Sequence, residues 1–189
     1  STLMSDLALI MALPNESKGL FEQAGVHVHY SGIGKVNAAF KAFEVIQNTG
    51  CRTVLNLGTA GSSYFDAHSL VEVTQFVQRD MDVSPLGFAV GQTPMDTDHP
   101  AEILLEPYFQ HLPVGICGTG DSFETGMPKV PCNLVDMEGY AMAKVCKKLG
   151  VRFVSVKYIT DGANETAHLD WEENLLLGAQ KLLSLYKLV

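Results

Sequence analysis

The chain has 189 residues, and its 13 Lys and Arg against 21 Asp and Glu give a formal net charge of −8. This charge does not suit nucleic acid or an anionic membrane surface, because both attract clustered Lys and Arg. An apolar share of 47% and a charged share of 18% are ordinary for a globular protein and exclude extensive disorder. We therefore expect no nucleic-acid partner and no membrane partner.

Location and domain organisation follow from a few negative signals. No apolar run reaches the roughly 18 residues that suggest a transmembrane helix, and the first residues lack the basic region of a signal peptide. Met4 fits the natural start, which would make residues 1–3 an addition. The cysteines form no CxxC pair, so we expect reduced thiols in a cytoplasmic protein. With no linker and no repeat, residues 1–189 are expected to form a single domain.

The N-terminal third alternates apolar strand patterns with helical spacing. In chain order it predicts a strand over 7–13, a helix over 15–24, a strand over 26–30, a helix over 35–48 and a strand over 53–57. The last of these strands leads into a glycine-rich turn at 58–61.

The rest of the chain continues the alternation. It predicts strands over 70–77, 114–117, 133–137 and 151–159, a weak helix over 101–110, a helix over 138–149 and a C-terminal helix over 170–188 capped by Asp170. The stretch 80–100 holds three prolines and no period, so it predicts a long loop of the kind that is often functional. The whole pattern indicates an α/β protein with a largely parallel or mixed sheet.

Three carboxylates follow predicted strands: Glu16, Glu138 and Asp161. In open α/β sheets, ligands bind beyond the carboxyl ends of the strands, so these side chains are expected at one rim. Acidic residues after strands are also common helix caps, and for any single one of the three that explanation is the better one. Three together shift the balance modestly towards a site.

Other motifs are weak. Residues 32–37, GIGKVN, lack the first glycine of a phosphate-binding loop, and Val36 replaces its Ser or Thr. His27 and His29 share a strand face, but no third ligand accompanies them. We therefore expect no metal.

Four segments together resemble the nucleoside phosphorylase and nucleosidase superfamily. They are SGIGKVNAA at 31–39, NLGTAG at 56–61, VDMEGYAMA at 135–143 and VKYITDGA at 156–163. Their order matches the superfamily, and the resemblance extends from Ala8 to about Leu185. Within it, the chain is most similar to the 5′-methylthioadenosine/S-adenosylhomocysteine nucleosidases.

The resemblance implies a three-layer α/β/α sandwich with a central mixed sheet, nucleoside phosphorylase-like, and usually a homodimer. It implies hydrolysis of the N-glycosidic bond of an adenine nucleoside, as in methionine salvage, without metal or organic cofactor. By position, Glu16 would activate water, Glu138 would bind the ribose hydroxyls and Asp161 would protonate N7 of adenine. The remaining substrate-binding positions that the resemblance implies are Thr59, Gly61, Phe123, Met137 and, on a loop serving the partner subunit, Leu86 and Phe88.

Several alternatives stay open. A purine nucleoside phosphorylase needs a phosphate site, usually with arginine, and Arg79 is the only serious candidate among Arg52, Arg79 and Arg152. Hydrolysis is therefore favoured. A futalosine-type nucleoside is another possible substrate. An inactive nucleoside-binding or storage-like homologue would require a misplaced Glu16, which the unusual Pro14–Asn15 pair before it could cause.

Overall fold

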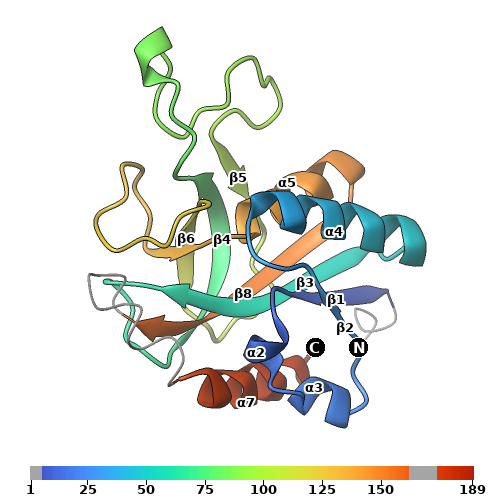
Figure 1. The fold of residues 1–189 in the computed structure, drawn as a ribbon. Coiled ribbons are helices and arrows are strands. Elements are labelled where there is room, and N and C mark those ends of the chain that lie inside the picture. Colours follow the sequence, from blue (N-terminus) through green and yellow to red (C-terminus); the bar gives the residue numbers. More distant parts are fainter. Residues whose placement is uncertain (1–5, 162–173) are drawn as a thin grey trace.

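The computed structural model describes residues 6–161 and 174–189. At its centre is an eight-stranded sheet. The strands are β1 (Leu7–Met11), β2 (Val28–Tyr30), β3 (Thr53–Gly61), β4 (Leu70–Gln78), β5 (Glu102–Leu104), β6 (Val114–Thr119), β7 (Leu134–Asp136) and β8 (Arg152–Asp161). Helices cover both faces of this sheet (Figure 1).

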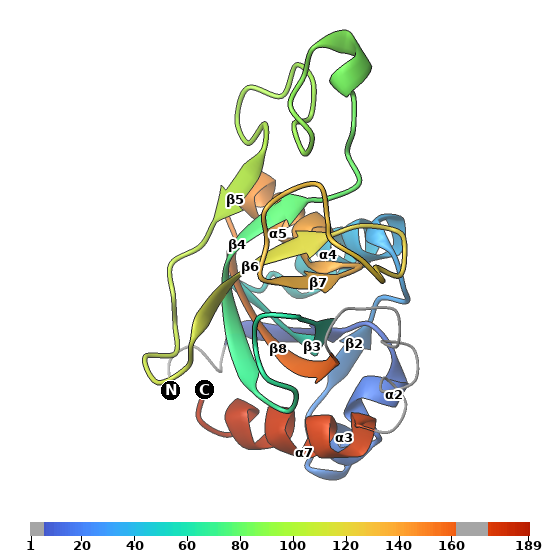
Figure 2. The ribbon, with the colours of Figure 1, turned by 90° about the vertical axis from the view of Figure 1, so that its left-hand side faces the viewer.

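The helices form the two outer layers. They are α2 (Pro14–Ser17), α3 (Leu20–Gln23), α4 (Lys35–Thr49), α5 (Gly139–Leu149) and α7 (Leu175–Tyr186), with one 3₁₀ turn, η1, at Ser84–Leu86. Helices α4 and α5 pack together on one face, whereas α2 and α3 pack with α7 on the other, as Figure 2 also shows. The three-layer α/β/α sandwich expected from the sequence is confirmed.

The sheet is mixed and curls back on itself. Two parallel groups can be distinguished: β2, β1, β3 and β8 form one, and β4, β6 and β7 form the other. The groups join by antiparallel contacts between β4 and β8, and between Gly61 of β3 and Val135 of β7. The carboxyl ends of β3 and β7 therefore meet, and this meeting point is where the pocket described below opens.

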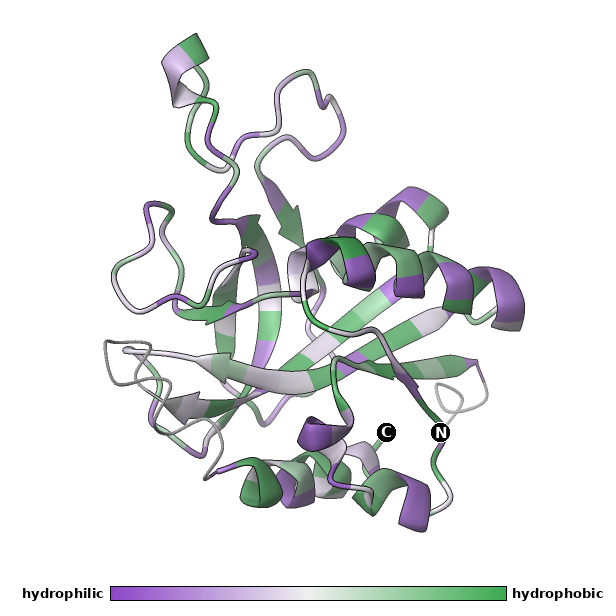
Figure 3. Cartoon of the chain, viewed as in Figure 1, coloured by the Kyte–Doolittle hydropathy of each residue, from purple (hydrophilic) through white to green (hydrophobic). Residues whose placement is uncertain are grey.

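Consecutive residues of a strand belong to the cores on opposite faces of the sheet, because side chains alternate between the two faces. Ile10 and Val54 belong to the core under α4 and α5, whereas Leu9 and Leu55 belong to the core against α7. Strands that are buried on both faces are expected to be nearly continuously apolar, and in Figure 3 green stretches run along the central strands, interrupted by pale and purple residues.

Three expected elements differ from the structure. The single helix expected over 15–24 is two short helices, α2 and α3, because Lys18 and Gly19 between them adopt left-handed backbone angles. The segment 101–110 holds no helix; it contains the short edge strand β5, which pairs antiparallel with β4. The glycine-rich stretch 58–61 is not a turn, because β3 continues through it while paired with β8. At 101–110 and at 58–61, pairing with a distant strand overrides the local preference for a helix and for a turn. The expected cap Asp170 lies outside the described residues.

No helix within residues 6–161 and 174–189 has the length and apolarity required to cross a bilayer.

Candidate active site

A pocket of about 280 Å³ opens where the carboxyl ends of β3 and β7 meet. Its walls come from the segments that follow β1, β2, β4, β6 and β7, together with β7 itself and the ends of β3 and β8. The lining residues are Ala12, Leu13, Glu16, Ile33, Thr59, Ala60, Gly61, Arg79, Ser122, Phe123, Glu124, Val135, Asp136, Met137, Glu138 and Thr160. The location agrees with the general rule that ligands bind beyond the carboxyl ends of strands.

Glu16 is buried on the short helix α2 and held by four hydrogen bonds. Its Oε1 accepts from the backbone N–H groups of Ala12 and Leu13, at 3.1 and 3.4 Å. Its Oε2 accepts from the N–H and the hydroxyl of Thr59, both at 2.8 Å. One oxygen thus orders the loop before α2 while the other faces β3, so helix capping accounts for only part of its role. Pro14 and Asn15 do not displace Glu16 from the pocket.

Glu138 lies at the N-terminus of α5 but does not cap it through its side chain. That task falls to Asp136, whose Oδ2 accepts from the N–H of Gly139 at 2.8 Å. The carboxylate of Glu138 instead accepts from the N–H of Gly34 at 2.9 Å, on the segment between β2 and α4. The capping explanation therefore fails for Glu138, and its carboxyl group is available to the pocket that it lines.

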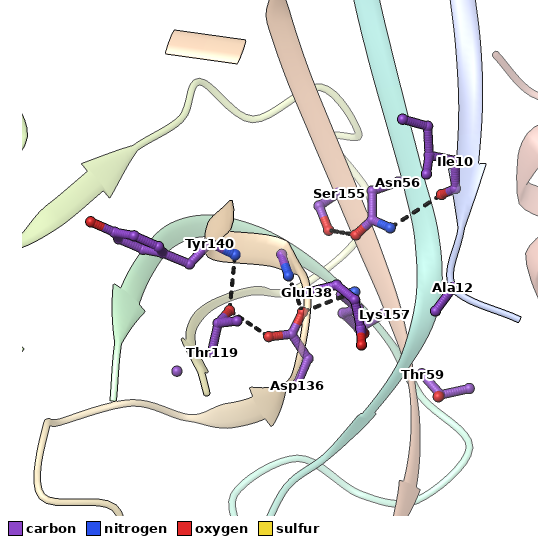
Figure 4. A network of polar contacts seen from close by, with 12 residues as sticks. Ile10, Ala12, Asn56, Thr59, Thr119, Asp136, Glu138, Tyr140, Ser155 and Lys157 are labelled. Carbon is purple, nitrogen blue, oxygen red and sulfur yellow. Dashed lines mark hydrogen bonds and ion pairs between the residues drawn. The ribbon is translucent and has the colours of Figure 1, made fainter. Parts of the chain in front are cut away.

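Behind Glu138 lies a buried ion pair, drawn in Figure 4. The ammonium of Lys157, on β8, is 3.1 Å from Oδ2 of Asp136, and the Lys157 residue is only 2% exposed. Asp136 Oδ1 also accepts from the Thr119 hydroxyl at 2.5 Å, and the Thr119 oxygen in turn accepts from the N–H of Tyr140. A buried charge needs such partners, since an unpaired one is strongly destabilising.

Glu16, Asp136 and Glu138 surround Lys157, so that three carboxyl groups share one ammonium. One positive charge cannot compensate three negative charges, and the pKa values of Asp136 and Glu138 separate as a result. Burial would raise the pKa of Asp136, but the charge of Lys157 and the hydrogen bonds from Thr119 and Gly139 outweigh it and hold that pKa below its ordinary value. For Glu138, burial and then the charge of Asp136 raise the pKa to about 8, despite the opposing effect of Lys157. Glu138 can therefore gain or lose a proton near neutral pH.

Glycine at two positions allows close approach in this cluster. A Cβ on Gly58 would lie 3.2 Å from Oε2 of Glu16 and 3.3 Å from Nζ of Lys157. A Cβ on Gly139 would lie 2.2 Å from the Phe76 ring, closer than real contacts allow. These two glycines let β3 and the start of α5 approach the charged groups.

Arg79, the candidate phosphate ligand, is buried just after β4 and is directed at the backbone. Its Nε donates to the carbonyl of Gly118 at 3.1 Å, and its Nη2 donates to the carbonyl of Ser122 at 2.6 Å. A guanidinium occupied in this way has little capacity left for an anion.

The structure gathers most of the residues singled out from the sequence. Glu16, Glu138, Thr59, Gly61, Phe123 and Met137 all line the pocket. The backbone of Asp161 ends β8 opposite Gly61, but its side chain lies outside the described part of the chain. Leu86 and Phe88 lie on the 80–100 loop and do not line this pocket. That loop extends away from the body of the molecule (Figure 1).

Sequence reasoning missed the Asp136–Lys157 pair and the pocket position of Ile33. A signal for Lys157 existed: a lone lysine in the middle of the apolar run 153–159 is a charge on a strand buried on both faces, which calls for a partner. Across the described ranges, no three His, Cys, Asp or Glu side chains gather as metal ligands. The chemistry that this pocket offers is proton transfer and hydrogen bonding by carboxyl groups.

Comparison with protein families places these features in context. A profile described as the phosphorylase superfamily matches residues 17–188. A 5′-methylthioadenosine/S-adenosylhomocysteine nucleosidase of Marinomonas sp. is 33% identical over 184 residues, covering 86% of this chain and 79% of that protein. An aminodeoxyfutalosine nucleosidase of Helicobacter pylori is 31% identical over 176 residues, covering 84% of this chain and 76% of that protein.

Solved structures agree. The 5′-methylthioadenosine/S-adenosylhomocysteine nucleosidase of Neisseria meningitidis, in complex with methylthio-immucillin-A, superposes with a TM-score of 0.77 and 27% identity, covering 92% of this chain and 93% of that one. A Helicobacter pylori nucleosidase mutant with 5′-methylthioadenosine in its active site gives a TM-score of 0.85, covering 97% and 99% of the two chains. At 23% identity this second likeness supports the fold alone.

Proposed function

The chain belongs to the phosphorylase superfamily, and from that premise we propose that it is a nucleosidase, an N-glycosyl hydrolase acting on adenine nucleosides. Its substrates would be of the 5′-methylthioadenosine and S-adenosylhomocysteine type, and its products adenine and a 5-substituted ribose. The observation that carries this proposal is the pair of buried carboxyl groups, Glu16 and Glu138, lining one pocket at the meeting strand ends.

The reaction breaks the bond between C1′ of the ribose and N9 of the base, and forms a bond from C1′ to the oxygen of water. Positive charge develops on the sugar and negative charge on the leaving base, as in glycoside hydrolysis. Glu16 orients the water and takes its proton. Its carboxylate is suited to this because four hydrogen bonds fix it in place.

Glu138 binds the ribose hydroxyl groups in this proposal. A carboxylate that accepts from both hydroxyls fixes the ring and also stabilises positive charge that develops nearby. With a pKa of about 8, Glu138 accepts from both hydroxyls through its two oxygens once it has released its proton. Lys157 compensates the resulting negative charge from the protein side.

Asp161 serves as the acid at N7, so that the base leaves as neutral adenine. Phe123 stacks on the base, Met137 lies beneath the ribose, and Thr59 and Gly61 lie beside the sugar. The pocket position of these four residues supports the assignment. Asp161 is assigned from the resemblance of its segment and from its place at the end of β8.

Hydrolysis is favoured over phosphorolysis because the described part of the chain offers no free arginine at the pocket. Arg79, which lines the pocket, donates to backbone carbonyls. Arg52 and Arg152 precede or begin strands, at the opposite ends of β3 and β8 from the pocket.

We propose that the protein is a homodimer and that the outer face of α4 forms the interface. This helix buries small residues, such as Ala38 and Ala42, and turns Val36 and Phe40 to the outside, where they are 81% and 63% exposed. Such a stripe is expected at an interface. The partner's 80–100 loop would then bring Leu86 and Phe88 to the 5′ substituent.

The remaining expectations are proposals of the same kind: a single domain, a cytoplasmic location and a role in methionine salvage. The four cysteines are free thiols, which agrees with a reducing compartment.

The test is adenine release from 5′-methylthioadenosine, with and without inorganic phosphate, with inosine as the 6-oxo control. Phosphate-independent release of adenine is expected. Release that requires phosphate would make the protein a phosphorylase, and no release from either nucleoside would favour the inactive homologue. Glu16→Gln should abolish most of the activity.

A second substrate class is favoured by one comparison, the aminodeoxyfutalosine nucleosidase at 31% identity. The chemistry at C1′ would be the same and only the 5′ group would differ. A competition assay, in which one enzyme sample is given both 5′-methylthioadenosine and aminodeoxyfutalosine, ranks the two substrates by kcat/KM.

A further inference from the structure

Arg79 makes an unusually complete set of contacts for a residue beside a pocket. Its guanidinium donates to four carbonyls and one hydroxyl. The acceptors are the carbonyls of Gly118 (3.1 Å), Gly120 (3.4 Å), Ser122 (2.6 Å) and Asp136 (3.1 Å), and the hydroxyl of Ser122 (3.1 Å). These acceptors belong to the end of β6, the segment that follows it and the end of β7. One side chain, just after β4, therefore links the ends of β4, β6 and β7.

The neighbouring glycines leave room for this side chain. A Cβ on Gly120 would lie 2.9 Å from both Cζ and Nη1 of Arg79, and a Cβ on Gly118 would lie 3.3 Å from its Cδ. The backbone after β6 thus fits closely around the guanidinium. This close fit is an observation independent of the hydrogen bonds.

The backbone that Arg79 binds leads directly into the pocket wall. Ser122, Phe123 and Glu124 all line the pocket, and Asp136 is the partner of Lys157. Nη1 also approaches Oε1 of Glu124 at 3.7 Å, an ion pair that is long compared with the contacts to the carbonyls. The Phe123 residue lines the pocket and is half exposed, so its position depends on the backbone that carries it.

We propose that Arg79 is a positioning residue of the active site, which fixes the 120–124 segment and thereby the base-binding wall formed by Phe123. The inference rests on the proposed function, in which Phe123 stacks on the base. Arg79 itself touches no substrate. Its fork geometry matters more than its charge, because spread-out carbonyls need several donors in fixed directions.

The kinetic test compares Arg79→Lys and Arg79→Met with Arg152→Lys, an exposed arginine away from the pocket. Lysine keeps the charge near Glu124 but cannot reach all five acceptors. We expect both Arg79 variants to raise KM for 5′-methylthioadenosine by roughly tenfold or more, with kcat changed less than about threefold. A third variant, Arg79→Ala, leaves space for a free guanidinium ion, so its KM should rise likewise and should fall again when guanidinium ion is added. Arg152→Lys should match the wild type.

Gly120→Ala gives a second route that leaves Arg79 in place. Its added Cβ would push on the guanidinium, so KM should rise as in Arg79→Lys. Gly126→Ala in the same loop is the matched control, because a Cβ there meets nothing within 4 Å. Both glycine substitutions keep the buried guanidinium of Arg79. They therefore test the proposal even if the Arg79 variants do not fold.

Hydrogen exchange at residues 120–124 tests the positioning without any substrate. Faster exchange in Arg79→Lys than in wild type supports the proposal even if the wild type releases no adenine, which would overturn the proposed function alone. The positioning proposal is overturned if folded Arg79→Lys shows unchanged exchange and unchanged KM. It is also overturned if Arg79→Lys keeps the KM of the wild type while Glu124→Gln raises it. The ion pair between Arg79 and Glu124, and not the hydrogen bonds to the carbonyls, would then determine substrate binding.

Discussion

At the scale of single residues, Glu138 links the site to the pH dependence of stability. Its pKa is raised from 4.5 to about 8 by burial and by Asp136. The folded chain therefore keeps a proton that the unfolded chain releases, and this contribution to stability is full below pH 4.5 and is lost as the pH rises through about 8. Stability of the wild type should fall over that interval for this reason.

Glu138→Gln removes this titration, so the melting temperature of the wild type should drop relative to the variant between pH 4.5 and 8. Several degrees are expected, because about 1 kcal/mol moves the melting temperature of a chain of this size by roughly 2–4 °C. Calorimetry at several pH values measures the difference, with the exposed Glu106→Gln as control. A difference between wild type and Glu138→Gln that stays constant with pH would contradict the assignment.

Lys157 is the single ammonium in a buried cluster of carboxyl groups. Lys157→Met should lower the free energy of unfolding by about 3–5 kcal/mol, since it leaves the Asp136 carboxylate buried without its ion-pair partner. Urea denaturation measures the loss. Adding Asp136→Asn should restore part of it, because the unpaired charge is then gone. Simple addition of the two single losses would show that the two side chains do not depend on each other.

Asp161 carries the clearest catalytic prediction. Asp161→Asn keeps the shape of the side chain but removes the acid, so turnover should fall by about 10²–10⁴, the usual contribution of a positioned proton donor. Adenine release is the measurement, and circular dichroism checks that the fold persists. Asp66→Asn, at an exposed position before β4, is the control. Unchanged turnover in Asp161→Asn would remove the acid assignment.

At the scale of elements, β3 is the strand on which the site depends. It runs through the glycine stretch 58–61 because β8 pairs with it as far as Gly61. Gly58→Ala would place a Cβ 3.2 Å from Oε2 of Glu16 and 3.3 Å from Nζ of Lys157. Since small displacements of catalytic groups are costly, kcat should fall by roughly tenfold or more.

The check for this prediction is the kinetic comparison of Gly58→Ala with Gly126→Ala, which places its Cβ in open space. Wild-type kcat in folded Gly58→Ala would mean that Glu16 tolerates displacement and is not the base toward water.

At the scale of the whole molecule, the prediction of a homodimer rests on the outer face of α4. Val36 and Phe40 are exposed on this helix while alanines face the core. Phe40→Glu should convert a dimer into a monomer, because a charge would be buried in an apolar contact. Analytical ultracentrifugation measures the mass. Leu176→Glu on α7, 52% exposed in the opposite layer, is the matched control and should remain dimeric.

A monomeric wild type in the same experiment would contradict the dimer proposal. It would also remove the proposed role of Leu86 and Phe88 in binding the 5′ substituent, because neither residue lines the pocket of its own chain.

Much of the architecture followed from local pattern. Apolar runs and helical spacing predicted the central strands, α4 and α5, and the order of the four motifs predicted the superfamily. Glu16 and Glu138 were singled out because they follow strands, and the structure gathers both at one pocket. The helix expected over 101–110 was wrong because that segment pairs with β4 as an edge strand.

By itself, the sequence determined the types of most elements, the α/β class and the carboxyl groups that follow strands, since these depend on residues close together in the chain. The three-layer arrangement followed from the resemblance of the four motifs to the superfamily. Only the tertiary structure decided which charges compensate one another. Gly34 reaches Glu138 across 104 positions, and Thr59 reaches Glu16 across 43. The contact between Gly34 and Glu138 joins the two parallel groups of strands, whereas the contact between Thr59 and Glu16 joins neighbouring strands within one group. Burial then strengthens the interactions between the charges gathered there.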